Sequence, residues 1–160
     1  DAQAVATLLF WTMGSFTRAS WDNLLLPSIT VTICLLVFLG FSRQMRTALA
    51  GDESARALGV DIHKLRINML LLSSLMTATL VANTGGIGFV GLMIPHIVRR
   101  LFFRYQRYFL WSCTIFGGCF MVWVDVLARS LMEESELPIG VITAALGSIF
   151  FLLVLKQRKG

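Results

Sequence analysis

An uncharged run over residues 67–98 is the feature that most constrains the fold of this chain. A helix rises about 1.5 Å per residue and must cross about 30 Å of hydrocarbon, so roughly 20 residues suffice for one crossing. The run is therefore longer than one membrane helix requires and shorter than two full crossings require. Its middle is rich in glycine, and Pro95 and His96 follow. The number of crossings decides the topology of everything after it.

The rest of the chain is also apolar. Hydrophobic residues make up 56% of the sequence and charged residues only 14%, a composition unlike that of a soluble domain. Three more uncharged stretches, residues 24–41, 108–124 and 137–155, are each near spanning length. The sequence therefore predicts an all-α, polytopic transmembrane helical bundle. The chain begins at Asp1 without a signal peptide, and we expect an N-terminal part to precede it.

The placement of the 14 Lys and Arg residues decides between one crossing and two. Short cytoplasmic loops are enriched in these residues. One crossing would put the basic loops 43–66 and 99–107 on opposite sides. Two crossings put every cation except Arg18 and Arg129 on one side, and the acidic turn 133–136 on the other. We therefore predict basic loops and a C-terminus in the cytoplasm, and helices over residues 24–41, 67–83, 87–101, 108–128 and 137–155.

Two crossings within residues 67–98 require a short, broken or re-entrant segment. Glycines allow a bend and close approach of the backbone, and Pro95 disturbs its own helix. Irregular backbone at membrane depth persists only where it is buried in protein or lines a cavity. We therefore predict that the segment packs centrally and lines a pathway. Two tightly packed helices with small-residue contacts are the alternative. The residues concerned are Gly85, Gly86, Gly88, Gly91 and Pro95.

Residues 42–66 form the only sizeable polar stretch, which we predict to be a cytoplasmic loop. Asp52 suits the N-cap or the first turn of a short helix over residues 53–58. Gly59 suits the C-terminal stop of that helix, and Asp61 can cap the next one. Two such helices make a compact surface that can dock in a cleft. A solvated connecting loop is the alternative.

Four segments resemble one family of membrane proteins. They are residues 51–60 (GDESARALGV), 86–99 (GIGFVGLMIPHIVR), 125–129 (DVLAR) and 136–143 (ELPIGVIT). In this order and spacing they are similar to FecCD-type permeases, the membrane subunits of ABC importers for iron–siderophore, haem and cobalamin. The resemblance covers the chain from about Trp11 to the C-terminus.

The resemblance implies a class-two ABC importer permease with ten helices, of which this chain holds five to six in the C-terminal half. It implies a multi-pass protein of the bacterial inner membrane with three kinds of partner: a second permease, cytoplasmic ATPase subunits and an external substrate-binding protein. ATP and Mg would bind to the ATPase, since this chain has no phosphate-binding loop, and the chain itself would be non-enzymatic. The expected cargo is a metal chelate, in the first place an iron–siderophore. An ion-coupled secondary transporter and a structural membrane anchor are the alternatives.

The resemblance also assigns roles to individual residues. Arg129 is expected to meet acidic side chains of the binding protein, and the alternative is a pair with Glu133 or Glu136 within the chain. Pro138 and Gly140 join the residues of the pathway or its packing. The expected contact with the ATPase consists of Gly51, Glu53, Ala55, Arg56, Leu58 and Gly59.

The remaining polar residues have structural explanations. Asp125 is the only acid inside an apolar helix, and a hydrogen bond to Arg129 at i+4 is a simpler expectation than a proton or sodium site. His96 is expected to pack and not to bind metal or haem, and no metal site is predicted. The arginines around 99–107 border hydrophobic spans. They therefore suit topology or anionic membrane lipid, and nucleic acid is disfavoured.

Overall fold

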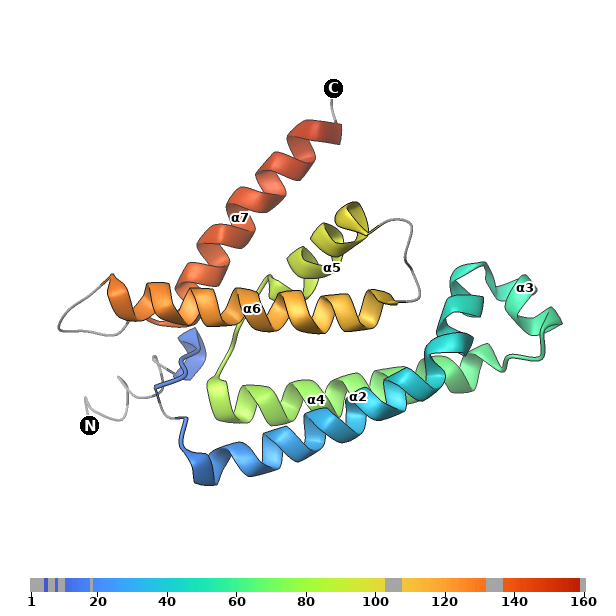
Figure 1. Ribbon diagram of the computed structural model, residues 1–160, viewed down its shortest axis with the longest axis horizontal. Coiled ribbons are helices and arrows are strands. Elements are labelled where there is room, and N and C mark those ends of the chain that lie inside the picture. Colours follow the sequence, from blue (N-terminus) through green and yellow to red (C-terminus); the bar gives the residue numbers. More distant parts are fainter. Residues whose placement is uncertain are drawn as a thin grey trace. The chain divides into compact units, whose positions relative to one another are not determined.

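The fold of the protein is built from long apolar helices, with a short helix after each of the first two (Figure 1). The computed structural model describes Val5, Leu8 and residues 11–17, 19–102, 108–131 and 137–158, and these residues include no strand. The all-α prediction is confirmed. The helices are α2 (Trp21–Leu49), α3 (Asp52–Ala57), α4 (Ile62–Thr84), α5 (Val90–Leu101), α6 (Phe109–Ser130) and α7 (Ile139–Arg158).

Four of the described helices, α2, α4, α6 and α7, are long and apolar enough to cross a membrane. By contrast, α5 has 12 residues and extends only about 18 Å, well short of the hydrocarbon thickness. The uncharged run therefore contains one long helix and one short one, separated by a break between Thr84 and Val90. The prediction of a short or broken segment within this run is confirmed.

Helix α2 is longer than one crossing requires. Its 29 residues extend about 43 Å, compared with about 30 Å of hydrocarbon. The uncharged part ends near Phe41, and the helix continues through the polar residues Arg43 and Arg46. The excess therefore lies at the end that leads into α3.

The chain forms two compact units, Ala19–Asn83 on the one hand and Asp1–Arg18 with Thr84–Gly160 on the other. In the Ala19–Asn83 unit, α2 and α4 run antiparallel (Figure 1), and the Cys34 Sγ lies 3.9 Å from the Leu72 carbonyl oxygen. Cys34 is buried at this contact. Helix α3 lies between the C-terminus of α2 and the N-terminus of α4, so it sits at the end that the two long helices share.

In the other unit, α5 packs against α6 and α7 through a buried face that includes Met93, Ile94 and Val98. The Arg100 Nη1 donates a 2.6 Å hydrogen bond to the Gln157 Oε1. The Arg99 guanidinium lies 5.3 Å from the centre of the Phe109 ring. The C-termini of α5 and α7 and the start of α6 therefore share one end of this unit.

Arg129 lies at the opposite end of α6, whose 22 residues extend about 33 Å. Within this unit, the described basic residues Arg99, Arg100 and Lys156 are thus separated from Arg129 by a membrane-spanning length. This separation agrees with the prediction from the charge pattern. The cations at 18, 104, 107 and 159 and the acidic residues at 133–136 lie outside the described residues, and the side chain of Arg158 is not described either.

Candidate functional site

Helix α3 is the short helix that the sequence predicts within the polar stretch 42–66, and local hydrogen bonds define its C-terminal end. Asp52 and Glu53 occupy its first turn. After Ala57 the chain turns at Gly59, whose φ of 78° is left-handed. The Val60 N–H donates to the Ala55 carbonyl at 3.0 Å and the Gly59 N–H to the Arg56 carbonyl at 2.9 Å, the paired bonds of a Schellman motif. The predicted glycine stop is confirmed.

The next helix, α4, begins with the predicted aspartate cap. The Asp61 Oδ1 accepts a 3.1 Å hydrogen bond from the Lys64 backbone N–H. This bond, together with the nearby Lys64 ammonium, lowers the pKa of the Asp61 carboxyl below its usual range. The charged form that accepts the bond is therefore present at neutral pH. The two caps fix a tight turn of four residues between α3 and α4.

The predicted coupling residues divide into an exposed set and a buried one. Glu53, Arg56 and Leu58 are exposed, and Leu58 retains 74% of its accessible surface. Ala55 is completely buried. Its side chain therefore lies on the buried face of α3, whereas the three exposed residues form the outer surface of the segment. Gly51 and Gly59 are exposed at the two ends.

Arg66 adds a contact that no local rule predicts. Its Nη2 donates to both carboxylate oxygens of Asp52, each at 3.0 Å. The pair joins the first turn of α3 to the second turn of α4. Asp52 and Arg66 are too far apart in the sequence for helical spacing to match them, so the sequence alone contains no signal for this pair.

The break between α4 and α5 is a junction of backbones. The Ser15 N–H donates a 2.8 Å bond to the Thr84 carbonyl. A Cβ at Gly85 would overlap the Trp11 carbonyl oxygen, and a Cβ at Gly86 would lie 3.1 Å from the Thr12 carbonyl oxygen. We call this contact of residues 11–15 with residues 84–86 the glycine junction.

The first turn of α7 completes the glycine junction. A Cβ at Gly140 would overlap the Met13 carbonyl oxygen and lie 2.9 Å from the Gly86 carbonyl oxygen. Gly14 is also tightly packed, since a Cβ there would lie 2.6 Å from the same Gly86 oxygen. Gly14 is absent from the residues predicted as a site, because its position opposite Gly86 and its φ of 73° are visible only in the structure. Pro138, just before α7, is buried beside this contact.

Gly88, in the break, and Gly91, in the first turn of α5, lie next to open space. A Cβ at Gly88 or Gly91 would have no other atom within 4 Å. Both residues are exposed. The glycines predicted together as pathway or packing residues therefore fall into two groups. Gly85, Gly86 and Gly140 pack against backbone, and Gly88 and Gly91 remain candidates for a pathway.

Helix α5 begins at a tight turn held by Phe89. Its φ of 66° is left-handed, and the Val90 N–H donates to the Gly88 carbonyl at 2.8 Å across it. The Phe89 side chain fills the space where a Cβ of Gly147 would lie, and its ring centre is 6.0 Å from that of Phe151. A bulky residue in this conformation persists only when its surroundings hold it, and α7 supplies that support.

Pro95 and His96 lie in the middle of α5. Pro95 has no N–H to donate to the carbonyl of Gly91, which weakens the helix at that point. His96 packs edge-on against Phe150, with ring centres 5.5 Å apart. The described residues contain no group of three or more His, Cys, Asp or Glu side chains that could hold a metal ion.

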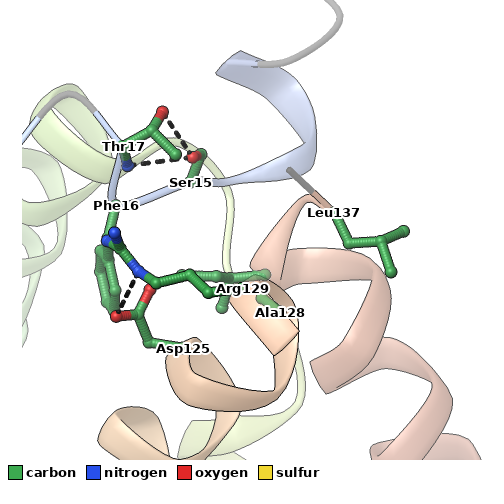
Figure 2. A pocket seen from close by; sticks show the side chains of 8 residues that line it. Ser15, Phe16, Thr17, Asp125, Ala128, Arg129 and Leu137 are labelled. Carbon is green, nitrogen blue, oxygen red and sulfur yellow. Dashed lines mark hydrogen bonds and ion pairs between the residues drawn. The ribbon is translucent and has the colours of Figure 1, made fainter. Parts of the chain in front are cut away.

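At the other end of this unit, Arg129 and Asp125 form an ion pair on α6. The Arg129 Nε donates to the Asp125 Oδ2 at 3.0 Å. Figure 2 shows the pair beside Ser15 and Thr17, on the rim of a small pocket. The predicted i+4 bond of Asp125 is confirmed. The alternative partners of Arg129, residues 133 and 136, lie outside the described residues.

Comparison with known proteins decides the family. The model of the FecCD transport family matches residues 1–157. The chain belongs to this family. The match includes α3, the glycine junction and the Asp125–Arg129 pair, so each of these features lies within a FecCD sequence.

Several FecCD relatives are similar over almost the entire chain. The hemin transport system permease protein HmuU of Yersinia pestis is 36% identical over 160 residues, which are 99% of this chain and 48% of that protein. The cobalamin import system permease protein BtuC of Halobacterium salinarum is 36% identical over 159 residues, 99% of this chain and 42% of that protein. The chain spans about half the length of the curated relatives that it matches.

A solved structure agrees with the FecCD fold. It is described as a metal-chelate type ABC transporter in an inward-facing conformation, and it matches with a TM-score of 0.88 and 34% sequence identity. The match covers 95% of this chain and 49% of the other. The predicted class, a helical bundle of the ABC importer permease type, is confirmed, and this FecCD chain is a multi-pass membrane protein.

Proposed function

We propose that this chain belongs to the permease subunit of an ATP-driven importer and that α3 is its contact with a cytoplasmic ATPase. The observation that carries the proposal is the construction of α3. A short, well-capped helix lies at the shared end of two spanning helices and exposes Glu53, Arg56 and Leu58. A charged and apolar surface on a rigid helix suits docking into a groove of another protein. Ala55 supports this surface by packing beneath it.

In the proposed mechanism, the ATPase binds ATP and Mg, and this chain performs no chemistry of its own. Closure of the nucleotide sites moves α3, and α3 moves the long helices around a central pathway. A rigid-body linkage of this kind transmits free energy between distant sites. The glycine junction would hold part of the bundle together during the movement. Gly88, Gly91 and His96 would lie along or near the pathway, because they are exposed in this chain.

The proposed cargo is a metal chelate, in the first place an iron–siderophore. Relatives of the chain are named for import of hemin, Fe(3+)-citrate, cobalamin and molybdate. Hemin, Fe(3+)-citrate and cobalamin are metal chelates, which supports this class, whereas molybdate is an oxyanion. The proposed setting is the bacterial inner membrane, with α3 and the C-terminus in the cytoplasm and a second permease across the pathway.

The test of the proposed function is uptake by the complete transporter in proteoliposomes. We expect uptake of a chelate such as hemin to require ATP inside the vesicle, an ATPase subunit and a binding protein outside. A proton gradient without ATP should drive no uptake. Uptake driven by the gradient alone would support an ion-coupled secondary transporter instead. The ion pair of Asp125 with Arg129 already argues against Asp125 as a free proton site.

Arg129 is the proposed contact with the external binding protein. It lies at the end of α6 away from the basic ends of α5 and α7, and about half of its side chain is exposed although it pairs with Asp125. We expect Arg129→Glu to weaken binding of the binding protein about tenfold or more, because an acidic partner would then meet a like charge. Surface plasmon resonance on the reconstituted transporter measures this affinity. Asp125→Asn is the control that breaks the internal pair and keeps the arginine. An unchanged affinity with Arg129→Glu would contradict the assignment.

A further inference from the structure

Two glycines at positive φ flank α3. Gly51 precedes the helix with a φ of 117°, and Gly59 follows it with a φ of 78°. A Cβ at either position would meet no atom within 4 Å. Glycine reaches positive φ without steric cost, so no side chain opposes a change of φ at either end of the helix. Backbone and capping hydrogen bonds fix the turn after α3 locally. To keep the orientation of the whole helix when a force acts on it, a side-chain contact with a neighbouring helix is also required.

The Asp52–Arg66 pair meets this requirement. Among the residues that the structure describes, it is the only side-chain ion pair or hydrogen bond that joins α3 to another helix, and both carboxylate oxygens accept from the Arg66 Nη2 at 3.0 Å. Burial of Ala55 adds a non-directional contact. The ion pair constrains the orientation of α3, since it connects the first turn of α3 directly to α4 without depending on the turn at Gly59.

The position of Arg66 suits it to transmit a movement of α3 to the membrane-spanning part of α4. It is the last charged residue before the uncharged run of residues 67–98, so it lies at the foot of the membrane-spanning part of α4. Both partners are partly exposed, with 66% of the arginine side chain and 43% of the aspartate side chain accessible. Exposed pairs contribute little to the stability of a fold. The pair is therefore better suited to orienting α3 than to holding the protein folded.

We propose that Asp52 and Arg66 form a latch that fixes α3 to the foot of α4, so that a movement imposed on α3 passes into the membrane helix. The proposal rests on the proposed function of α3 as the ATPase contact. Asp52 and Arg66 are positioning residues in this mechanism. Without the latch, α3 would still bind the ATPase, but part of each movement would be lost as rotation at Gly51 and Gly59.

The experiment measures substrate moved per ATP hydrolysed by the complete transporter in proteoliposomes. Asp52→Arg and Arg66→Asp each break the pair, and the double variant with both changes restores it in reverse. We expect each single variant to lower the ratio up to about fivefold, the range of a surface ion pair, while the ATPase still co-purifies. The double variant should return within about twofold of the wild type, since arginine suits the first turn of a helix less well than aspartate.

A matched control is Lys64→Ala. The ion pair that Lys64 forms among the described residues joins it to Asp61, just before α4, at 3.2 Å and not to α3, so its removal should leave the ratio unchanged. Spin labels on Ser54→Cys and His63→Cys, both exposed positions, report the orientation of α3 directly. We expect the distance distribution between the labels to broaden in the single variants and to narrow again in the double variant.

The latch is overturned if the single variants match Lys64→Ala in transport ratio and label distance, or if the reversed pair fails to restore them. The proposed function fails in a different way. If Arg56→Glu on the outer surface of α3 leaves ATPase binding and uptake unchanged, α3 is not the coupling contact, whatever the latch variants do. If Arg56→Glu abolishes uptake and the latch variants do not lower the ratio, only the latch is refuted.

Discussion

Replacing Gly85 with alanine is expected to destabilise the protein by about 2–5 kcal/mol, the cost of overpacking combined with that of a left-handed residue. The φ of Gly85 is +73°, and its Cβ would overlap the carbonyl oxygen of Trp11. A clash with backbone cannot be relieved by a change of rotamer. The two backbone segments of the glycine junction, residues 11–15 and 84–86, would have to move apart. The 2.8 Å hydrogen bond between the Ser15 N–H and the Thr84 carbonyl would then be lost.

The measurement is the melting temperature of the complete permease in detergent, together with the amount of folded protein in the membrane. Gly140→Ala should behave similarly, because its Cβ would overlap the Met13 carbonyl oxygen. Gly88→Ala and Gly91→Ala are matched controls, since their Cβ atoms would meet nothing within 4 Å. Gly91→Ala, within α5, should even stabilise the helix by about 0.5–1 kcal/mol. A wild-type melting temperature for both Gly85→Ala and Gly140→Ala would contradict the close approach at the glycine junction.

Reversing the charge of Arg56 is expected to lower ATP-driven uptake at least tenfold without loss of the inserted permease. Arg56 lies in the last turn of α3 and is exposed. Arginines at the centre of an interface commonly contribute about 2 kcal/mol or more to binding, and an opposite charge adds repulsion. Co-purification of the ATPase and uptake in proteoliposomes measure the two consequences separately.

Two further variants make the Arg56 result specific. Lys64→Glu makes the same charge change on the first turn of α4, where the side chain is 80% exposed, and should leave uptake close to that of the wild type. Arg56→Gln removes the charge without adding repulsion and should reduce uptake less than Arg56→Glu does. Normal uptake by a well-expressed Arg56→Glu variant would refute the coupling role of α3.

The local structure of α3 and of the turn that leads into α4 follows from the sequence almost completely. Gly59 ends α3, and Asp61 caps α4, as their residue types predict. Both features depend on hydrogen bonds between residues three to five positions apart, so the necessary information lies within one short window. The Asp125–Arg129 bond was predictable for the same reason, since helical spacing places i and i+4 side by side.

The roles of the glycines could not be separated in this way. The four glycines between residues 85 and 91 are alike in the sequence. Gly85 and Gly86 nevertheless lie against the backbone of residues 11–14, whereas a Cβ at Gly88 or Gly91 would meet open space. The difference depends on which segment lies opposite each glycine. Likewise, Ala55 looked like part of a docking surface until the structure placed it completely inside the protein.

The sequence by itself determined the class of this protein, its spanning helices, the break in the long uncharged run and the capped helix α3. These follow from apolar length, charge placement and local hydrogen bonding, each of which is a property of neighbouring residues. Only the tertiary structure decided that the break is a junction of backbones at Gly85, Gly86 and Gly140, and that Asp52 pairs with Arg66. Contacts between segments far apart in the chain depend on how helices pack, and that is fixed by the whole fold.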